Sequence, residues 1–129
     1  MVGRAGDLMS YIAKDAASYL TKTVGTGQCV PFVQAASGAP VSTMWKKGAA
    51  VKGNLTLKSG TAIAIFSAAG KYESKTDGTS HAAIYRSQSA TGIVVMDQWI
   101  GQPVHERPIR FNNPSGKIVN QGESYHVVD

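Results

Sequence analysis

The stretch GTGQCVPFVQAA (residues 25–36) places the only cysteine of the chain, Cys29, between a glycine-rich turn and a helical pattern. Glycine permits a tight turn and proline is tolerated in the first turn of a helix, so Pro31 predicts a helix that begins near Cys29. Gly38 is the expected end of that helix. The free N–H groups and the dipole at a helix N-terminus favour a thiolate and can hold an oxyanion. Cys29 is therefore a candidate nucleophile; the alternative is a small, buried apolar side chain.

The composition is that of one compact domain spanning residues 1–129. Hydrophobic residues make up 43% of the chain and charged residues 16%, and no internal repeat or low-complexity tract divides it. The single cysteine excludes an intramolecular disulfide. Histidine, cysteine and acidic residues show no metal-ligand spacing, so neither a metal nor another cofactor is expected.

The termini and the charge limit where the protein acts and what it binds. Residues 1–7 lack the apolar core of a secretory signal, and no apolar run is long enough to span a bilayer. We therefore expect a protein that is made in the cytoplasm and does not insert into membranes.

The net charge of +5 is scattered along the chain, with Lys46 and Lys47 the only adjacent pair. This charge favours a polyanionic partner such as an anionic envelope, and a contribution to solubility alone is the alternative. No basic helix or aromatic-basic interleaving marks a nucleic-acid surface, so a nucleic-acid partner is not expected.

The order of the predicted elements indicates an α+β fold. Apolar residues at helical spacing predict an amphipathic helix over residues 8–21, ahead of the Cys29 helix. From Gly60 onward the pattern is that of strands, which are expected at 61–66, 81–85, 93–99, 103–111 and 124–128. The prolines in the fourth of these strands place it at an edge of the sheet. We therefore expect N-terminal helices packed on one face of an antiparallel sheet.

A thiol nucleophile needs a histidine within hydrogen-bond reach and a third polar group that orients the imidazole. Of the three histidines, His81 opens an apolar strand after a long polar loop, where one end of the side chain can face a cleft. His105 lies between prolines on the expected edge strand, and His126 lies in the last strand. His81 is therefore the candidate general base and acid, and a structural role is its alternative.

A symmetric hairpin formed by residues 81–85 and 93–99 would place Asp97 directly opposite His81. Opposed side chains in an antiparallel pair lie close enough for a carboxylate to bond an imidazole. Asp97 is therefore the expected orienting group, which would fix the tautomer of His81 without moving a proton itself. A slip of one residue would present Gln98 instead, so Gln98 is held in reserve, and a third possibility is that Asp97 only caps a strand end.

These residues carry a resemblance to known enzymes. The segments Gly27–Val30 and Ser80–Ile84 resemble the nucleophile and histidine motifs of small bacterial papain-like cysteine peptidases, the NlpC-type and CHAP amidases. The resemblance implies a papain-like fold and cleavage of cell-wall peptides.

A closer resemblance covers most of the chain. It is to a compact bacterial family related to the amidase effectors of type VI secretion, and it is carried by the segments 60–64, 70–72, 81–85, 97–99 and 107–111. This resemblance implies an antibacterial effector without a signal peptide that is delivered to the periplasm of a rival cell. There it would hydrolyse peptidoglycan stem peptides, and a cognate immunity protein would protect the producer.

The hypothesis from sequence is a peptidoglycan amidase with a Cys29–His81–Asp97 triad. Trp99, Tyr72 and Gln28 are candidates for the walls of the substrate groove, and a place in the hydrophobic core is the alternative for the two aromatic residues. The backbone N–H of Cys29 is the one assigned oxyanion donor, and the second donor stays unassigned. Two alternatives remain: a non-catalytic module that binds an envelope polymer or a partner protein, and a papain-like acyl hydrolase that acts on lipid or thioester substrates.

Overall fold

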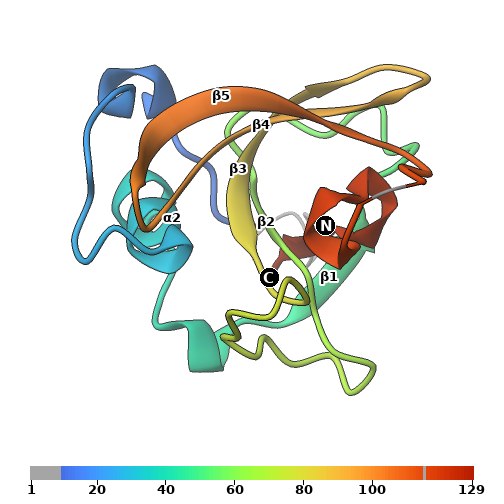
Figure 1. Cartoon of the computed structure of the whole chain (residues 1–129), viewed down its shortest axis with the longest axis horizontal. Coiled ribbons are helices and arrows are strands. Elements are labelled where there is room, and N and C mark those ends of the chain that lie inside the picture. The colour runs from blue at the N-terminus through green and yellow to red at the C-terminus, as the bar shows by residue number, and fades with distance from the viewer. Residues whose placement is uncertain (1–9, 115) are drawn as a thin grey trace, which may run out of the picture.

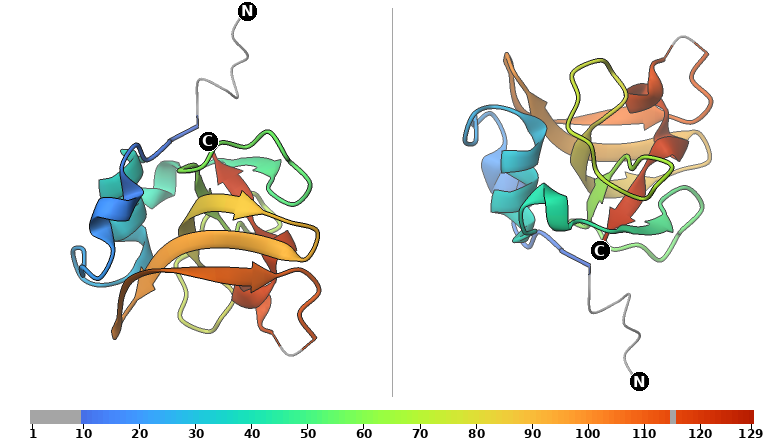
Figure 2. Two further views of the ribbon diagram at one scale, coloured as in Figure 1. Left: turned by 90° about the horizontal axis from the view of Figure 1, so that it is seen from above. Right: turned by 90° about the horizontal axis from the view of Figure 1, so that it is seen from below.

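The computed structural model describes residues 10–114 and 116–129 of the chain. Within these residues one α-helix, α2, and short 3-10 helices accompany one six-stranded antiparallel sheet in the order β1-β6-β2-β3-β4-β5 (Figures 1 and 2). The α+β expectation is thereby confirmed. The bounds are η1 Ala16–Tyr19, α2 Cys29–Ser37, η2 Ser42–Met44, β1 Lys47–Ala50, β2 Ala62–Ala64, β3 Ala82–Gln88, β4 Gly92–Trp99, β5 Gln102–Arg110, η3 Ile118–Asn120, η4 Gly122–Ser124 and β6 His126–Val128.

The helix predicted over residues 8–21 is wrong for most of its described part. Residues 8 and 9 lie outside the described residues, and only the 3-10 turn Ala16–Tyr19 is helical. The preceding backbone is extended, because Ala13 N–H donates to the carbonyl of Gly60 and Ala62 N–H donates to the carbonyl of Tyr11, both at 2.8 Å. Pairing with a distant segment therefore outweighs the local helical pattern.

The helix predicted at Cys29 is confirmed as α2, Cys29–Ser37. It ends at Gly38, whose φ of 78° lies in the left-handed region that glycine adopts without strain. Phe32 and Val33 are fully buried in the core between α2 and the sheet. Figure 1 shows α2 beside β3 and β4, so the packing of these two side chains fixes where the N-terminus of the helix lies.

A second core lies on the other face of the sheet, because neighbouring strand residues point to opposite sides. Ala83 and Tyr85 of β3 belong to it, whereas Ala82 and Ile84 pack with α2. Both faces of the central strands are therefore buried, and the end of the sheet near His81 lies between the two cores. β5 forms one edge, as its prolines predict.

The predicted register of the β3–β4 hairpin is wrong by two residues. Tyr85 pairs with Val95 rather than with Ile93, which pairs with Gln88 instead. The strands extend further than expected, so that only residues 89–91 lie between them. The continuation of the observed register places Ala83, not His81, directly across from Asp97.

A bulge at Arg86 nevertheless keeps His81 and Asp97 on one face of the sheet. Between the pairs Tyr85–Val95 and Ser87–Val94 β3 contains one residue more than β4. Without this extra residue, the register of Ser87 and Val94 would continue along β3, and His81 would lie on the same face as Gln98 instead of Asp97.

The helices within residues 10–114 and 116–129 include none with the length and apolar character that a membrane span requires.

Candidate active site

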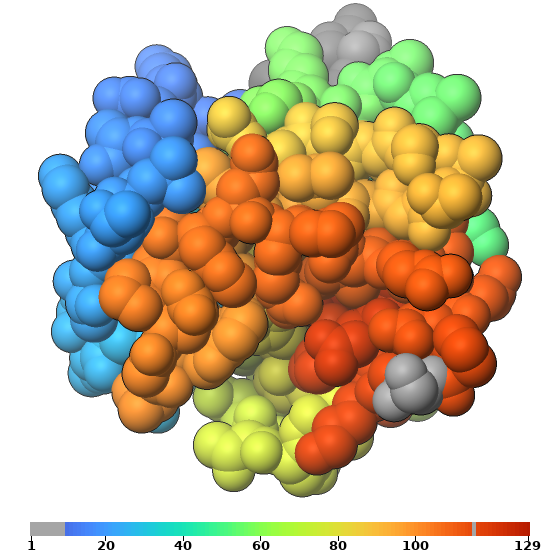
Figure 3. Space-filling view, turned by 45° about the horizontal axis from the view of Figure 1, so that its top comes forward, coloured from blue at the N-terminus to red at the C-terminus, as the bar shows by residue number. Residues whose placement is uncertain are grey.

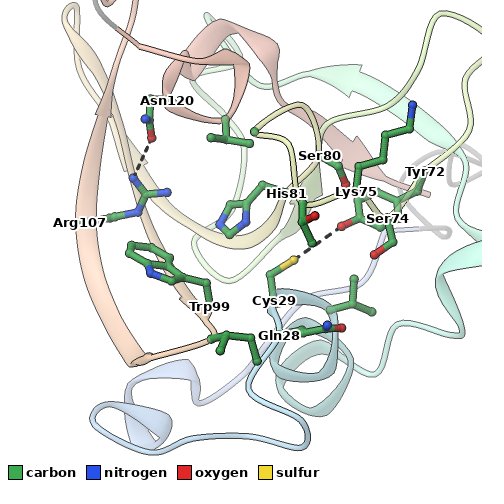
Figure 4. A pocket seen from close by; sticks show the side chains of 15 residues that line it. Gln28, Cys29, Tyr72, Ser74, Lys75, Ser80, His81, Trp99, Arg107 and Asn120 are labelled. Carbon is green, nitrogen blue, oxygen red and sulfur yellow. Dashed lines mark hydrogen bonds between the residues drawn. The ribbon is translucent and has the colours of Figure 1, made fainter.

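A pocket of about 470 Å³ opens where the N-terminus of α2 meets the end of the sheet. Figure 3 shows the surface hollowed between the loop before β3 and the turn that joins β4 to β5. Five parts of the chain line it, and the lining residues include Gln28, Cys29, Tyr72, Lys75, Ser80, His81, Trp99, Arg107 and Asn120 (Figure 4). Every residue that the sequence predicts for the site except Asp97 and Gln98 lines this pocket.

Cys29 is the first residue of α2, and its side chain points into the pocket beside His81 (Figure 4). The preceding turn includes Gly25 and Gly27 with φ of 57° and 89°, values that other residues rarely adopt. A side chain on Gly25 would also lie 2.8 Å from Pro31. The glycines thus allow the chain to turn sharply into the helix, and Cys29 comes to the helix end.

His81 lies directly before β3 and bonds Asp97 of β4. Its Nε2 atom lies 2.7 Å from Oδ2 of Asp97, and both side chains are buried. Because Asp97 occupies Nε2, Nδ1 is the ring nitrogen left for Cys29. The two residues that the sequence places opposite each other are therefore in contact, although by a diagonal reach across the strands.

Asp97 is fully buried, and the basic side chains of Arg107 and His105 lie beside its carboxylate in addition to His81. Arg107 of β5 donates from Nε to Oδ2 at 2.9 Å and to Oδ1 at 3.2 Å, and its Nη2 lies 2.9 Å from Oδ2. His105 places Nε2 at 2.9 Å from Oδ1, but the geometry of this contact is not that of a hydrogen bond. We take Arg107 as the principal counter-charge, since a buried carboxylate requires both charge and hydrogen bonds.

The pKa shifts of Cys29 and His81 favour an ion pair. Burial raises the pKa of the Cys29 thiol, but His81, with smaller contributions from Tyr72 and the backbone of Ala82, outweighs burial and lowers it. Burial lowers the pKa of His81, but Asp97 and Cys29 outweigh it and raise this pKa to about 9. Both shifts favour a thiolate beside an imidazolium.

The pKa of Asp97 moves in the direction that supports this pair. Burial acts to raise it, but the bond to His81 and the contact with Arg107 outweigh burial and hold the pKa below its usual value. Asp97 therefore stays ionised in this buried place and can stabilise a positive imidazole.

Aromatic side chains close two sides of the pocket. The hydroxyl of Tyr72 lies 3.6 Å from Sγ of Cys29, and its ring packs on Trp45 at 4.9 Å between centroids. Trp99 meets His81 edge-on at 6.4 Å and lies under the guanidinium of Arg107 at 5.1 Å. Tyr72, one of the three residues predicted for the walls of the groove, therefore places its hydroxyl beside the sulfur of Cys29.

A family model described as domesticated amidase effector 2 matches residues 6–128. The chain belongs to this amidase family. The type VI secretion amidase effector 2 protein of Salmonella typhi is 34% identical over 122 residues, which are 84% of this chain and 90% of that protein. The domesticated amidase effector 2 of Ixodes scapularis is 38% identical over 87 residues, which are 66% of this chain and 56% of that protein.

The fold agrees with this assignment. A solved structure described as type 6 secretion amidase effector 2 superimposes with a TM-score of 0.80 at 34% identity. The match covers 92% of this chain and 94% of the other. As a member of the domesticated amidase effector 2 family, the protein is a hydrolase of the amidase class, in agreement with the resemblance identified in the sequence.

Gln98, the alternative to Asp97 as the group that orients His81, points to the opposite face of the sheet and does not contact the imidazole. Its side-chain amide bonds the backbone of Val24 and Gln28 instead of the imidazole. This follows from strand alternation, since Asp97 and Gln98 are neighbours and point to opposite faces.

Sequence reasoning missed the groups around Asp97. In the β4–β5 pairing His105 lies across from Asp97, and Arg107 lies two residues further along the same face. A register worked out for this second hairpin, which turns at Gly101, would have found both.

Among the described residues, no group of three histidine, cysteine or acidic side chains is arranged to hold a metal ion.

Proposed function

We propose that this protein hydrolyses an amide bond in peptidoglycan stem peptides or their cross-links, with Cys29 as nucleophile, His81 as base and acid, and Asp97 as the group that orients His81. The observation that carries the proposal is the placement of Cys29 at the N-terminus of α2, beside a histidine that bonds a buried carboxylate. Membership of an amidase family supports the reaction class. A cysteine at the start of a helix, beside a histidine that directly precedes a strand of the sheet, also supports a papain-like, NlpC/CHAP-type arrangement.

The proposed reaction starts from the thiolate and the imidazolium. The sulfur of Cys29 attacks the carbonyl carbon of the amide, and the carbonyl oxygen becomes an oxyanion. His81 gives its proton to the amide nitrogen, the C–N bond breaks, and the amine leaves an acyl group on the sulfur. Water then attacks the thioester while His81 takes its proton, and collapse releases the carboxylic acid and restores the thiolate.

Two donors are available for the oxyanion. One is the backbone N–H of Cys29 at the positive end of α2. The second proposed donor is the hydroxyl of Tyr72, which lies 3.6 Å from the sulfur. Burial and the nearby Cys29 raise the pKa of Tyr72 well above its usual value, so this group remains a neutral O–H donor over the working pH range.

The groove residues suit a polar, carboxylate-bearing polymer. Lys75 lines the pocket, its ammonium group lies 3.3 Å from Glu73, and its side chain is half-exposed. With the net charge of +5, this arrangement favours stem peptides with free carboxylates. Trp99 and Gln28 at the pocket rim are the proposed walls that hold the peptide.

The proposed setting is antibacterial competition. The Salmonella typhi relative is named as a type VI secretion effector, and we extend delivery into the periplasm of a target bacterium to this chain. A producer would then need a cognate immunity protein. The Ixodes scapularis relative is named as a domesticated amidase effector.

Purified sacculi test this proposal directly. The wild-type protein is expected to release new muropeptides, and Cys29→Ala and His81→Ala are expected to release none. His126→Ala is the matched control, because His126 does not line the pocket. Absence of products with the wild-type protein would contradict the cell-wall reaction, and equal activity of His81→Ala would contradict the triad. Rapid alkylation of Cys29 by iodoacetamide at mildly acidic pH separates an enzyme from a binding module.

A further inference from the structure

Gln98 of β4 is a fully buried polar side chain whose hydrogen bonds all go to one loop. Its Oε1 atom accepts from the N–H of Val24 at 3.0 Å. Its Nε2 atom donates to the carbonyl of Val24 at 2.8 Å and to the carbonyl of Gln28 at 2.7 Å. One donor and two acceptors on the backbone fix the orientation of the amide.

The bonded loop is the turn that leads directly into the nucleophile. Val24 and Gln28 are its first and last residues, and Gln28 is the N-cap of α2, directly before Cys29. The side chain of Gln28 makes no capping bond. Inside the loop, the N–H of Gly27 donates to the carbonyl of Val24 at 3.0 Å. The amide of Gln98 thus ties both ends of the turn to the sheet.

We propose that Gln98 is a positioning residue that sets where Cys29 lies relative to His81. Asp97 and Gln98 are neighbours on β4, and Asp97 holds His81 on one face while Gln98 holds the Cys29 loop on the other. One rigid strand therefore determines the separation of both reaction partners. The inference rests on the proposed function, because it takes Cys29 as nucleophile. A misplacement of a reacting group by about 1 Å can lower a reaction rate by about 10²-fold. Loss of the bonds from Gln98 to the Cys29 loop is therefore expected to slow hydrolysis by a factor of that size.

A purely structural role for Gln98 is the alternative, and β3 offers a matched control. Gln88 holds the loop of residues 51–54 by the same kind of contacts. Its Nε2 atom donates to the carbonyls of Val51 and Asn54 at 2.9 and 3.1 Å, and its Oε1 atom accepts from Gly53 at 2.9 Å. Neither Gln88 nor that loop lines the pocket. The same substitution at Gln88 therefore removes a comparable clamp without touching the Cys29 loop.

The experiment compares Gln98→Met with Gln88→Met. Methionine keeps the length and volume of glutamine and removes its hydrogen bonds. For each variant the melting temperature, the release of muropeptides from sacculi and the pH dependence of Cys29 alkylation by iodoacetamide are measured. Both variants are expected to melt at a lower temperature. Only Gln98→Met is expected to lose about 10²-fold in hydrolysis and to move the alkylation profile toward that of a free thiol.

Gln98→Asn is the second variant, since it keeps an amide that is one methylene too short to bridge Val24 and Gln28. The assays are run below the melting temperature of each variant. Wild-type hydrolysis and alkylation in folded Gln98→Met or Gln98→Asn would overturn the inference, as would an equal loss in Gln88→Met. If the wild-type protein were inactive on sacculi, the proposed function would fail, but the alkylation profiles would still decide the role of Gln98.

Discussion

Oδ2 of Asp97 lies 2.7 Å from Nε2 of His81 and 2.9 Å from Nε of Arg107, so one carboxylate oxygen serves both cations. His81 belongs to the site and Arg107 comes from the edge strand β5. The negative charge of Asp97 is therefore shared between the imidazole of His81 and the guanidinium of Arg107. Changes at Asp97 and at Arg107 are expected to move the basicity of His81 in opposite directions.

Asp97→Asn should lower kcat by about 10²-fold or more, because the neutral amide no longer fixes the tautomer or stabilises the imidazolium. The same change should lower the pKa of His81 from about 9 toward its ordinary value. The alkaline limb of the rate profile then shifts to lower pH. Muropeptide release measured across pH checks both effects, with the exposed Asp15→Asn as control. An unshifted limb would show that Asp97 does not act through His81.

Arg107→Gln should have the opposite effect on the profile. Without the guanidinium, Oδ2 of Asp97 no longer shares its charge between Arg107 and His81, so the pKa of His81 rises and the alkaline limb moves to higher pH. Loss of a charged hydrogen-bond donor to a buried carboxylate should also lower the free energy of unfolding by about 2 kcal/mol. Arg110→Gln on the same strand is the control, because Arg110 is exposed. Thermal denaturation and pH–rate profiles give both readouts.

The fold near Cys29, the proposed nucleophile, could be predicted because its signals are local. Two glycines, Pro31 and Gly38 define the turn, the start and the end of α2 within a short stretch. The segment at residues 10–15 could not be predicted in this way, because its backbone pairs with residues near Gly60 that are far along the chain. Non-local pairing of this kind leaves no periodic pattern in the segment itself.

The candidate site was predictable in its residue types but not in its geometry. His81 and Asp97 could be selected from residue type and alternation, whereas their true register depends on the unpaired Arg86. A single extra residue in a strand has no clear sequence signal. Arg107 and the second role of Gln98 depend on the pairing of β4 with β5 and on the path of the Cys29 loop, which only the three-dimensional arrangement supplies.

The wild-type pH profile should be broad and should have an alkaline limb near pH 9. The proposed reactive form has Cys29 deprotonated and His81 protonated, so activity rises as pH passes the lowered pKa of Cys29. It falls as pH passes the pKa of His81, about 9, because the leaving amine then receives no proton. Alkylation of Cys29 needs only the thiolate, so its rate should not fall along the same limb. A parallel fall of both rates would contradict the acid role of His81.

Tyr72→Phe tests whether the Tyr72 hydroxyl donates to the oxyanion or to the thiolate of Cys29. If Tyr72 donates to the oxyanion, kcat should fall by about 10²-fold, since removal of one such donor has an effect of that size. Alkylation by iodoacetamide forms no oxyanion, so its rate and pH profile should stay close to those of the wild type, with only a small rise in the pKa of Cys29. Tyr85→Phe, which removes a buried hydroxyl bonded to Gln88, is the control. A loss of alkylation as large as the loss of hydrolysis would assign the Tyr72 hydroxyl to the thiolate instead, and full hydrolytic activity would leave it as a wall of the groove.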